Sequence, residues 1–476
     1  MKKHLGILLA VSSLPGNHGI GDFGDSCYKL IDWLADNGYE YWQTLPLNPV
    51  GPGYSPYMST SSNALEYRYI SLDMVSKMGL IPKVAPHNPD TTHVDYYDVG
   101  EFKRRELYLA YRKFIKNHKE TLHKFKTQNP WVNTYATFEV FKSLNDNKQW
   151  NEWDERFLNY FNHHNKPPRT FKTEINFVIF LQYLALKQWK RVLRYAKKKN
   201  IKIICDMPFY VGFDGVECWL HRDQFQIGPD NKLFEVGGVG PDAFSDVGQL
   251  WGSPIYNFER MKKDNYKLLI DRVGYLASLC DYLRIDHFRA FDTYYVIPAG
   301  EETARNGEWK IGPRDEFFNE LYKRYPNINL IAEDLGDLRP EVLELRDQFN
   351  LPGMFICEFT IFDLKQESTE RQLVYPGTHD NETLYGWYLN LNDDQRWFIA
   401  NRLNTTYDDG LYDKIVEYIY KIPSLMTIFQ LQDVLKLDNS GRMNWPGTVG
   451  DPNWTWKLKD FSFTKEVKYP KKEWVE

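Results

Sequence analysis

Eight short apolar runs recur along this chain of 476 residues, and most of them end in polar residues. This recurrence constrains the fold more than any other feature of the sequence. Short, nearly continuous hydrophobic runs are typical of strands that a parallel sheet buries on both faces. The candidate strands are residues 4–14, 39–46, 202–208, 282–287, 329–334, 353–359, 372–379 and 426–432.

Helical patterns lie between many of these runs. Residues 28–38 place apolar side chains at helical spacing and stop at a glycine, and residues 180–199 end in a basic turn that suits the helix dipole. Further helices are expected at residues 266–279, 314–325 and 339–349. A strand followed by a helix, repeated eight times, predicts an α/β protein built on a (β/α)8 TIM barrel.

An open, doubly wound sheet has the same alternation and is the alternative fold. The count of eight candidate strands and the polar residues at their C-terminal ends favour the barrel, because a barrel gathers such ends at one mouth.

The uneven spacing of the strands predicts how the chain is organised. Residues 1–58 and 176–456 should form the catalytic barrel, with a glycine-rich connection at about 212–258 that is placed to act as a mobile lid. Residues 59–175 are interpreted as a mostly helical insertion packed on one side of the barrel. The lysine-rich residues 457–476 are expected to lie on the surface.

Charge and cysteine content exclude some classes of partner. Fifty-nine basic and 64 acidic residues give a net charge of -5, which argues against a nucleic-acid partner that would require a basic face. No stretch approaches the roughly 18 apolar residues of a membrane span, so we expect no membrane association. The five cysteines are odd in number and widely spaced, which favours reduced thiols and a cytoplasmic protein.

Four of the candidate strands end in a carboxylate. These residues are Asp206, Asp286, Glu333 and Asp380. A barrel brings its C-terminal strand ends to one mouth, and four acids there would repel one another and be costly to bury. Each acid alone could cap a turn or lie in a solvated loop, but their joint placement indicates a functional site.

Arg284 and Asp286 are two residues apart on a strand and therefore share a face. The adjacent guanidinium should lower the pKa of Asp286 and keep it ionised, as a nucleophile on a sugar carbon requires. Glu333 should lie near other acids and apolar walls, which would raise its pKa as a general acid requires. Such a pair, about 5–5.5 Å apart, defines a retaining glycosidase-type mechanism. A buried ion pair without catalytic role is the alternative for Arg284 and Asp286.

Several segments resemble signatures of a known enzyme family. Residues 283–289, 331–336 and 377–381 resemble three signature regions of the α-amylase clan. The remaining motifs are similar to one branch of that clan, the 4-α-glucanotransferases (amylomaltases or disproportionating enzymes, glycoside hydrolase family 77). These motifs are residues 13–15 with 19–24, 42–47, 55–57, 241–245 with 248–252 and Pro254, and 442–444 with 446–448 and 453–454.

The resemblance implies a barrel with helical insertions that needs no metal and no cofactor. It implies Asp286 as nucleophile, Glu333 as acid/base and Asp380 as transition-state stabiliser. The expected substrates are malto-oligosaccharides and linear α-1,4-glucans, and we expect a monomer or a weak homo-oligomer. Further substrate-binding candidates are Arg284, His287, His379, Asn381, Trp251, Tyr54, Ser55, Asp206 and Asn444. His287 could instead be a histidine packed beside Phe288, and Tyr54 and Tyr57 could be either sugar platforms or core residues.

Two other functions stay open on the sequence. An α-glucan hydrolase of the same clan would carry the same three acids, so only the branch-specific motifs favour a transferase. A non-catalytic glucan-binding protein would be expected to have lost one of the acids. The chain also departs from the family pattern at Met58, residues 60–68, Ala290 and Glu382.

Overall fold

A computed structural model describes residues 4–241, 246–363 and 368–465. All eight predicted strands are present in it, and hydrogen bonds join them into one parallel sheet. The strands are β1 (Leu5–Leu8), β2 (Tyr41–Gln43), β3 (Lys202–Met207), β6 (Tyr282–Ile285), β9 (Leu330–Ala332), β10 (Met354–Ile356), β11 (Leu373–Tyr375) and β12 (Met426–Gln430).

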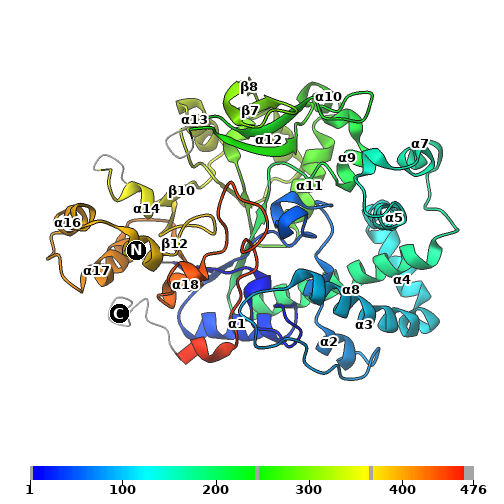
Figure 1. The fold of residues 1–476 in the computed structure, drawn as a ribbon, viewed down its shortest axis with the longest axis horizontal. Helices are drawn as coiled ribbons and strands as arrows, with labels where there is room; N and C mark the ends of the chain where they lie inside the picture. The colour runs from blue at the N-terminus through cyan, green and yellow to red at the C-terminus, as the bar shows by residue number, and fades with distance from the viewer. Residues whose placement is uncertain (1–3, 242–245, 364–367, 466–476) are drawn as a thin grey trace.

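The sheet is nearly closed into a barrel. Its strand order is β10-β11-β12-β1-β2-β3-β6-β9, so β9 and β10 lie at the two ends. The backbone N–H of Ala332 donates to the carbonyl of Pro352 at 2.9 Å and so joins the two ends. The prediction of a barrel is therefore confirmed, and the doubly wound alternative is wrong (Figure 1).

Helices cover the outside of the barrel where the sequence predicts them. Each helix overlaps a predicted one, because its apolar stripe packs on the sheet and its polar face meets solvent. These helices are α1 (Asp25–Asp36), α8 (Lys172–Lys198), α11 (Lys267–Ala277), α12 (Arg314–Arg324) and α13 (Pro340–Gln348).

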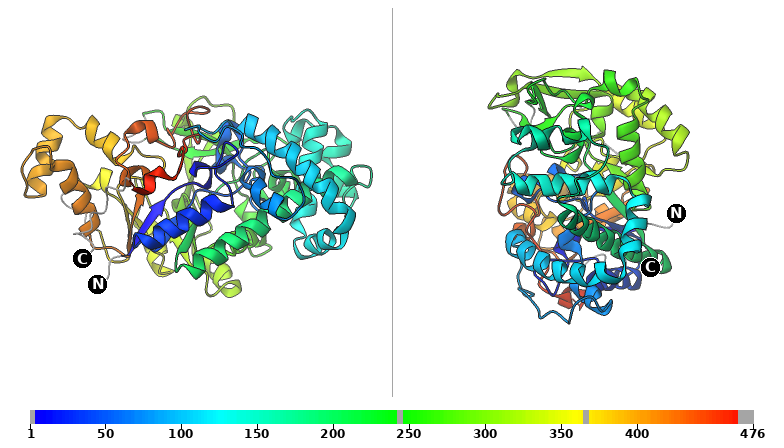
Figure 2. Two further views of the ribbon diagram at one scale, coloured as in Figure 1. Left: turned by 90° about the horizontal axis from the view of Figure 1, so that it is seen from below. Right: turned by 90° about the vertical axis from the view of Figure 1, so that its right-hand side faces the viewer.

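Two groups of helices extend the molecule at opposite ends, with the barrel between them (Figures 1 and 2). The helical insertion predicted at residues 59–175 forms one end. Its helices are α2 (Leu72–Lys77), α3 (Tyr96–Asn117), α4 (Lys119–Gln128), α5 (Trp131–Leu144), α6 (Glu155–Leu158) and α7 (Tyr160–His163). The other end consists of α15 (Leu384–Asn390), α16 (Asp393–Arg402) and α17 (Leu411–Lys421).

Helix α8 belongs to both the barrel and the insertion. It packs against β3 and α1 on the barrel side and against α3, α4 and α5 on the insertion side. The expected boundary between residues 175 and 176 falls inside this helix. The helix therefore packs against both parts, and the domain limits remain a prediction.

The connection at residues 212–258 differs from the expected lid loop. It contains α9 (Val216–Leu220), β4 (Glu235–Val239) and β5 (Gln249–Pro254), and it ends at the start of α10 (Phe258–Lys262). Strands β4 and β5 join β7 (Thr293–Pro298) and β8 (Glu308–Ile311) in a second, antiparallel sheet. The glycines that suggested a loop allow close packing here, since a methyl group on Gly238 would lie 2.3 Å from the carbonyl oxygen of Gln249. Residues 242–245 of the motif at 241–245 lie outside the described residues.

The start of the C-terminal segment is packed into the protein. The side chain of Lys457 is 1% exposed and donates to the carbonyl of Thr91 at 2.6 Å, and Leu458 and Phe463 are also buried. These three residues are therefore not at the predicted surface location, whereas Lys459, Asp460, Ser462 and Lys465 are exposed as expected. Residues 466–476 lie outside the described residues. Among the described helices, none is long and apolar enough to cross a membrane.

Two buried glutamines on α8 fix the segment that leads away from the barrel mouth. The amide of Gln182 accepts from the N–H of Leu65 at 2.9 Å and donates to the carbonyl of the same residue at 2.8 Å. Gln188 makes the equivalent pair with Ser71, at 2.8 and 3.2 Å. Each side chain thus satisfies a buried backbone donor and acceptor that would otherwise be unpaired.

We predict that Gln182→Leu lowers the free energy of unfolding by about 2–4 kcal/mol, because leucine has a similar size but leaves two buried polar groups unpaired. Urea unfolding followed by circular dichroism measures the change. Lys190→Gln, at an exposed position of the same helix, should shift the unfolding free energy by less than about 0.5 kcal/mol. Equal stability of Gln182→Leu and the wild type would contradict this account.

Candidate active site

The guanidinium of Arg284 links two of the predicted acids at the barrel mouth. Arg284 on β6 is the register partner of Asp206 on β3. Its Nη1 donates to both carboxylate oxygens of Asp206, at 2.7 and 2.8 Å, and to Oδ1 of Asp286 at 3.0 Å. The predicted shared face of Arg284 and Asp286 is confirmed, and Asp206 joins them there.

The electrostatics of Asp286 differ from the expectation. Burial raises the pKa of Asp286, and although Arg284 lowers it, Asp206 and Asp380 raise it again, to about 7. The expected low pKa is therefore wrong. The physical reason is that burial outweighs the effect of Arg284, and the negative charge of Asp206, which shares the same guanidinium, raises the pKa further.

Glu333 follows β9 and lies beside the residue after Asp286. Its Oε2 accepts from the backbone N–H of His287 at 2.6 Å, and its own N–H donates to the carbonyl of Ile285 at 3.0 Å. Burial raises the pKa of Glu333 well above its ordinary value, the nearby Arg284 lowers it, and the negative charge of Asp286 raises it further. The expected rise for Glu333 is confirmed, and the neighbouring charge of Asp286 contributes to it.

His287 has a neutral imidazole at this site. It adopts a left-handed backbone conformation with φ 51°, which lets its N–H point to Glu333. Burial, and then the charge of Arg289, lower the pKa of His287 to about 3. Its Nε2 is buried and has no hydrogen-bond partner among the described residues, so it is available to a ligand.

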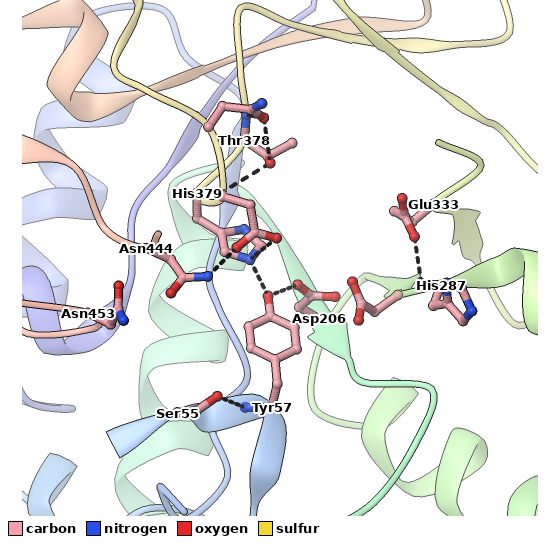
Figure 3. Close-up of polar contacts among 12 residues, drawn as sticks. Ser55, Tyr57, Asp206, His287, Glu333, Thr378, His379, Asn444 and Asn453 are labelled. Atoms are coloured by element: carbon pink, nitrogen blue, oxygen red, sulfur yellow. Dashed lines mark hydrogen bonds and ion pairs between the residues drawn. The ribbon is translucent and has the colours of Figure 1, made fainter. Parts of the chain in front are cut away.

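Tyr57 joins segments that lie far apart in the sequence (Figure 3). Its hydroxyl donates to Oδ2 of Asp206 at 2.7 Å and lies 2.8 Å from Nε2 of His379. The rings of Tyr57 and His379 also stack, with centroids 5.3 Å apart. The sequence left Tyr57 undecided between a sugar platform and a core residue, whereas the structure gives it two polar partners at the site.

Asp380 is held by the segment that follows β12. The Asn444 side chain donates to Oδ1 of Asp380 at 2.7 Å, and Arg442 donates to its backbone carbonyl at 2.9 Å. Nε2 of His379 lies 3.4 Å from Oδ2 of Asp380. Asn381 closes the turn, because its Oδ1 accepts from the N–H of Thr378 at 2.8 Å. Asn444 and Asn381 therefore contact the site's own residues, and their contact with substrate remains a prediction.

The other three predicted binding residues have different surroundings. Trp251 on β5 meets His287 edge to face, with ring centroids 4.9 Å apart. Ser55 accepts from the N–H of Tyr57 at 3.2 Å and so supports that turn. The ring of Tyr54 stacks on Tyr96 at 4.8 Å, and no described contact joins it to the acids.

Two further acids at the barrel mouth were missed from the sequence. Glu358 follows β10 on α14 (Cys357–Thr360), and Asp433 follows β12 on α18 (Leu431–Val434). Both are buried, with 6% and 2% exposure. Their position near the ends of candidate strands was the available signal. The candidate strand at residues 353–359 included Glu358, and the one at residues 426–432 stopped just before Asp433, so neither acid was assigned to the barrel mouth.

The arrangement suits chemistry on an uncharged polar ligand. It combines two neighbouring carboxyl groups with raised pKa values and the neutral imidazole of His287, with aromatic rings around them. Over residues 4–241, 246–363 and 368–465, no group of three His, Cys, Asp or Glu side chains is arranged to hold a metal ion.

Comparisons with known proteins agree over almost the whole chain. A family model described as 4-alpha-glucanotransferase, of glycoside hydrolase family 77, matches residues 9–464. The 4-alpha-glucanotransferase of Synechocystis sp. is 36% identical over 481 residues, which cover 96% of this chain and 94% of that protein. The protein of the same name from Clostridium butyricum is 35% identical and covers 96% of both chains.

Solved structures give the same result. The amylomaltase from Streptococcus agalactiae, determined in complex with acarbose, superposes with a TM-score of 0.90 and 32% identity, over 100% of this chain and 96% of that one. The amylomaltase from Corynebacterium glutamicum has a TM-score of 0.75 at 17% identity, over 96% of this chain and 72% of that one, and shares the fold.

Because its pKa rises on folding, Asp286 lowers the free energy of unfolding at neutral and alkaline pH. A carboxyl group whose pKa rises on folding holds its proton more tightly in the folded state, so stability falls as the pH rises from about 4 to about 7. We predict that Asp286→Asn is more stable than the wild type by about 1–2 kcal/mol at pH 8 and nearly equal at pH 4. This is less than the full shift implies, because 28% of the side chain remains exposed.

Urea unfolding at the two pH values measures this difference. Glu344→Gln removes an exposed carboxylate on α13 and should stay within about 0.5 kcal/mol of the wild type at both. An Asp286→Asn protein that is less stable than the wild type at pH 8 would refute the assignment.

Proposed function

The chain belongs to the 4-alpha-glucanotransferase family and is a hexosyltransferase, and we propose that Asp286, Glu333 and Asp380 carry out the transfer on malto-oligosaccharides and linear α-1,4-glucans. One observation supports this assignment most directly. The backbone N–H that follows Asp286 donates to the carboxyl group of Glu333 at 2.6 Å, which brings the two acids to one place on neighbouring strands.

In the first step, Glu333 donates its proton to the glycosidic oxygen while the carboxylate of Asp286 attacks C1 of the donor sugar. The C1–O bond to the leaving fragment breaks and a C1–O bond to Asp286 forms, which gives a covalent glycosyl-enzyme. The fragment that carries the reducing end leaves with the proton. Glu333 is left as a carboxylate.

In the second step, Glu333 takes the proton from the 4-hydroxyl of an acceptor sugar. The acceptor oxygen attacks C1, the bond to Asp286 breaks, and the carboxylate of Asp286 is restored together with the proton on Glu333. Two inversions give net retention at C1. Glu333 therefore carries the proton in the free enzyme and has lost it in the covalent intermediate, where it can act as the base of the second step.

Asp380 and the neutral imidazoles have supporting roles in this mechanism. Asp380 would accept hydrogen bonds from sugar hydroxyls and favour a distorted ring with positive charge at C1. The free Nε2 of His287 would bond to a hydroxyl of the bound sugar. Arg284 and Tyr57 donate hydrogen bonds to the carboxylate of Asp206, and His379 contacts the hydroxyl of Tyr57. These contacts fix the residues beneath the bound sugar.

Transfer requires that water be kept from the covalent intermediate while the acceptor is held in place. Trp251 is our candidate for this task, because its ring lies against His287 at the edge of the site. It belongs to β5, in the same sheet as β7 and β8, which lie to one side of the barrel (Figure 1). A hydrolase would carry the same acids, and the relatives reported above share the transferase name instead.

The location and assembly of the protein are proposals of the same kind. We propose a cytoplasmic enzyme that is a monomer or a weak homo-oligomer. Five cysteines without disulfide bonds support a reducing compartment, and four of them are buried.

We predict that Asp286→Asn and Glu333→Gln each lower kcat on maltotriose by at least about a thousandfold, because each step needs both groups. Product analysis by chromatography and glucose release measures the rates, and Glu344→Gln should match the wild type. Binding of maltotriose by Asp286→Asn, followed by calorimetry, should persist. Full activity of either variant would remove that residue from the mechanism.

We predict that the wild type converts maltotriose into a ladder of longer products, and that Trp251→Ala raises the fraction of hydrolysis. Loss of the indole would admit water to the intermediate and weaken the hold on the acceptor. The measurement is the ratio of elongated chains to newly formed reducing ends. Accumulating glucose and maltose without elongation by the wild type would favour the hydrolase, and an unchanged ratio in Trp251→Ala would exclude the role given to this residue.

A further inference from the structure

A buried carboxyl group without a role in the mechanism lies under the turn that carries Asp380. Glu358 is 6% exposed at the start of α14, and its backbone N–H donates to the carbonyl of Pro376 at 3.0 Å. Oε1 of its side chain is buried and has no hydrogen-bond partner among the described residues. A charged carboxylate in such a place would be costly, and a buried group of this kind calls for an explanation.

The carboxyl group packs directly against Gly377. A methyl group added at Gly377 would lie 2.8 Å from Oε1 of Glu358 and 2.8 Å from Cβ of Asn381, so these two side chains enclose the glycine. Asn381 in turn accepts from the N–H and the hydroxyl of Thr378, at 2.8 and 3.0 Å. Glu358 therefore lies beneath a closed turn whose two central residues face the site.

The charges around Glu358 disfavour its ionised form. Burial raises the pKa of Glu358 well above its ordinary value, and the acids Asp433 on α18 and Glu382 before α15 raise it further. Among the described residues, Arg442 is the cation that lowers this pKa, and its guanidinium already donates to the carbonyls of Asp380 and Asn444, at 2.9 and 2.8 Å.

We propose that Glu358 is a positioning residue whose uncharged carboxyl group supports the Gly377–Asn381 turn and leaves Arg442 free to hold Asp380. An ionised Glu358 would attract Arg442 away from the carbonyl of Asp380 and repel Asp433. The inference rests on the proposed function only in that Asp380 must act in the reaction. The protonation of Glu358 can be tested without reference to catalysis.

Infrared difference spectroscopy tests the protonation state directly. The spectrum of the wild type minus that of Glu358→Gln at pH 7 should show the carbonyl stretch of one protonated carboxyl group. The other protonated acids cancel in the difference. A difference spectrum with carboxylate bands alone would overturn the proposal, whatever the activity of the variant.

Kinetics tests the positioning role. Glu358→Ala removes the support, and we expect kcat to fall about ten- to a hundredfold while KM changes less than about threefold, because misplacement of a catalytic group acts on the chemical step. Glu358→Gln keeps the size and the neutral state and should recover most of this loss. Glu344→Gln is the control for the loss of an exposed carboxylate, and urea unfolding confirms that each variant is folded.

Two kinetic results would overturn the inference. If Glu358→Gln were as impaired as Glu358→Ala, a neutral side chain of this size would not be sufficient, and the ionised carboxylate of Glu358 would be needed. If Glu358→Ala were as active as the wild type, the Gly377–Asn381 turn would not need support from Glu358. Failure of the proposed function is distinguishable, because it would appear as full activity of Asp380→Asn while the infrared band of Glu358 persists.

Discussion

The shared guanidinium of Arg284 is the interaction on which the site depends. One nitrogen of this side chain holds both Asp206 and Asp286, from neighbouring strands, at 2.7–3.0 Å. Without it, two buried carboxylates would face each other across β3 and β6 at a high electrostatic cost. With it, the carboxylate form of Asp286, which is the form that attacks C1, is favoured against the burial and the neighbouring acids that raise its pKa.

Tyr57 connects the residues around Arg284 to the helical insertion. Tyr57 reaches Asp206 and His379 from a loop that continues into residues 59–71. Gln182 and Gln188 anchor the end of that segment to α8 through paired backbone hydrogen bonds. The long helix therefore couples the packing of the insertion to the geometry of the barrel mouth, which explains why the insertion is packed and not a loose appendage.

The sequence predicted the barrel because the period of its apolar runs reflects burial on both sides of a parallel sheet. It predicted the grouping of Asp206, Asp286 and Glu333 because strand ends meet at one mouth. It missed the second sheet, since glycines in β4 serve close packing where a loop was expected. The pKa of Asp286 was also mispredicted, because its burial and the charge of Asp206 both come from segments that are distant in the sequence. Glu358 was not identified as a site residue because it fell inside the predicted strand at residues 353–359.

The barrel mouth thus concentrates groups that weaken the fold at neutral pH. Burial raises the pKa values of Asp286, Glu333, Glu358 and Asp433, and a raised carboxyl pKa contributes stability that is lost as the pH rises. Such costs are tolerated because the eight-stranded core and the helices around it stabilise the fold independently of the mouth. Asp433 illustrates the balance, since its Oδ1 accepts from the N–H of Leu384 at 2.7 Å and so orients α15 while its burial is costly. The same desolvation that destabilises these acids keeps a proton where a glycosidic oxygen needs it.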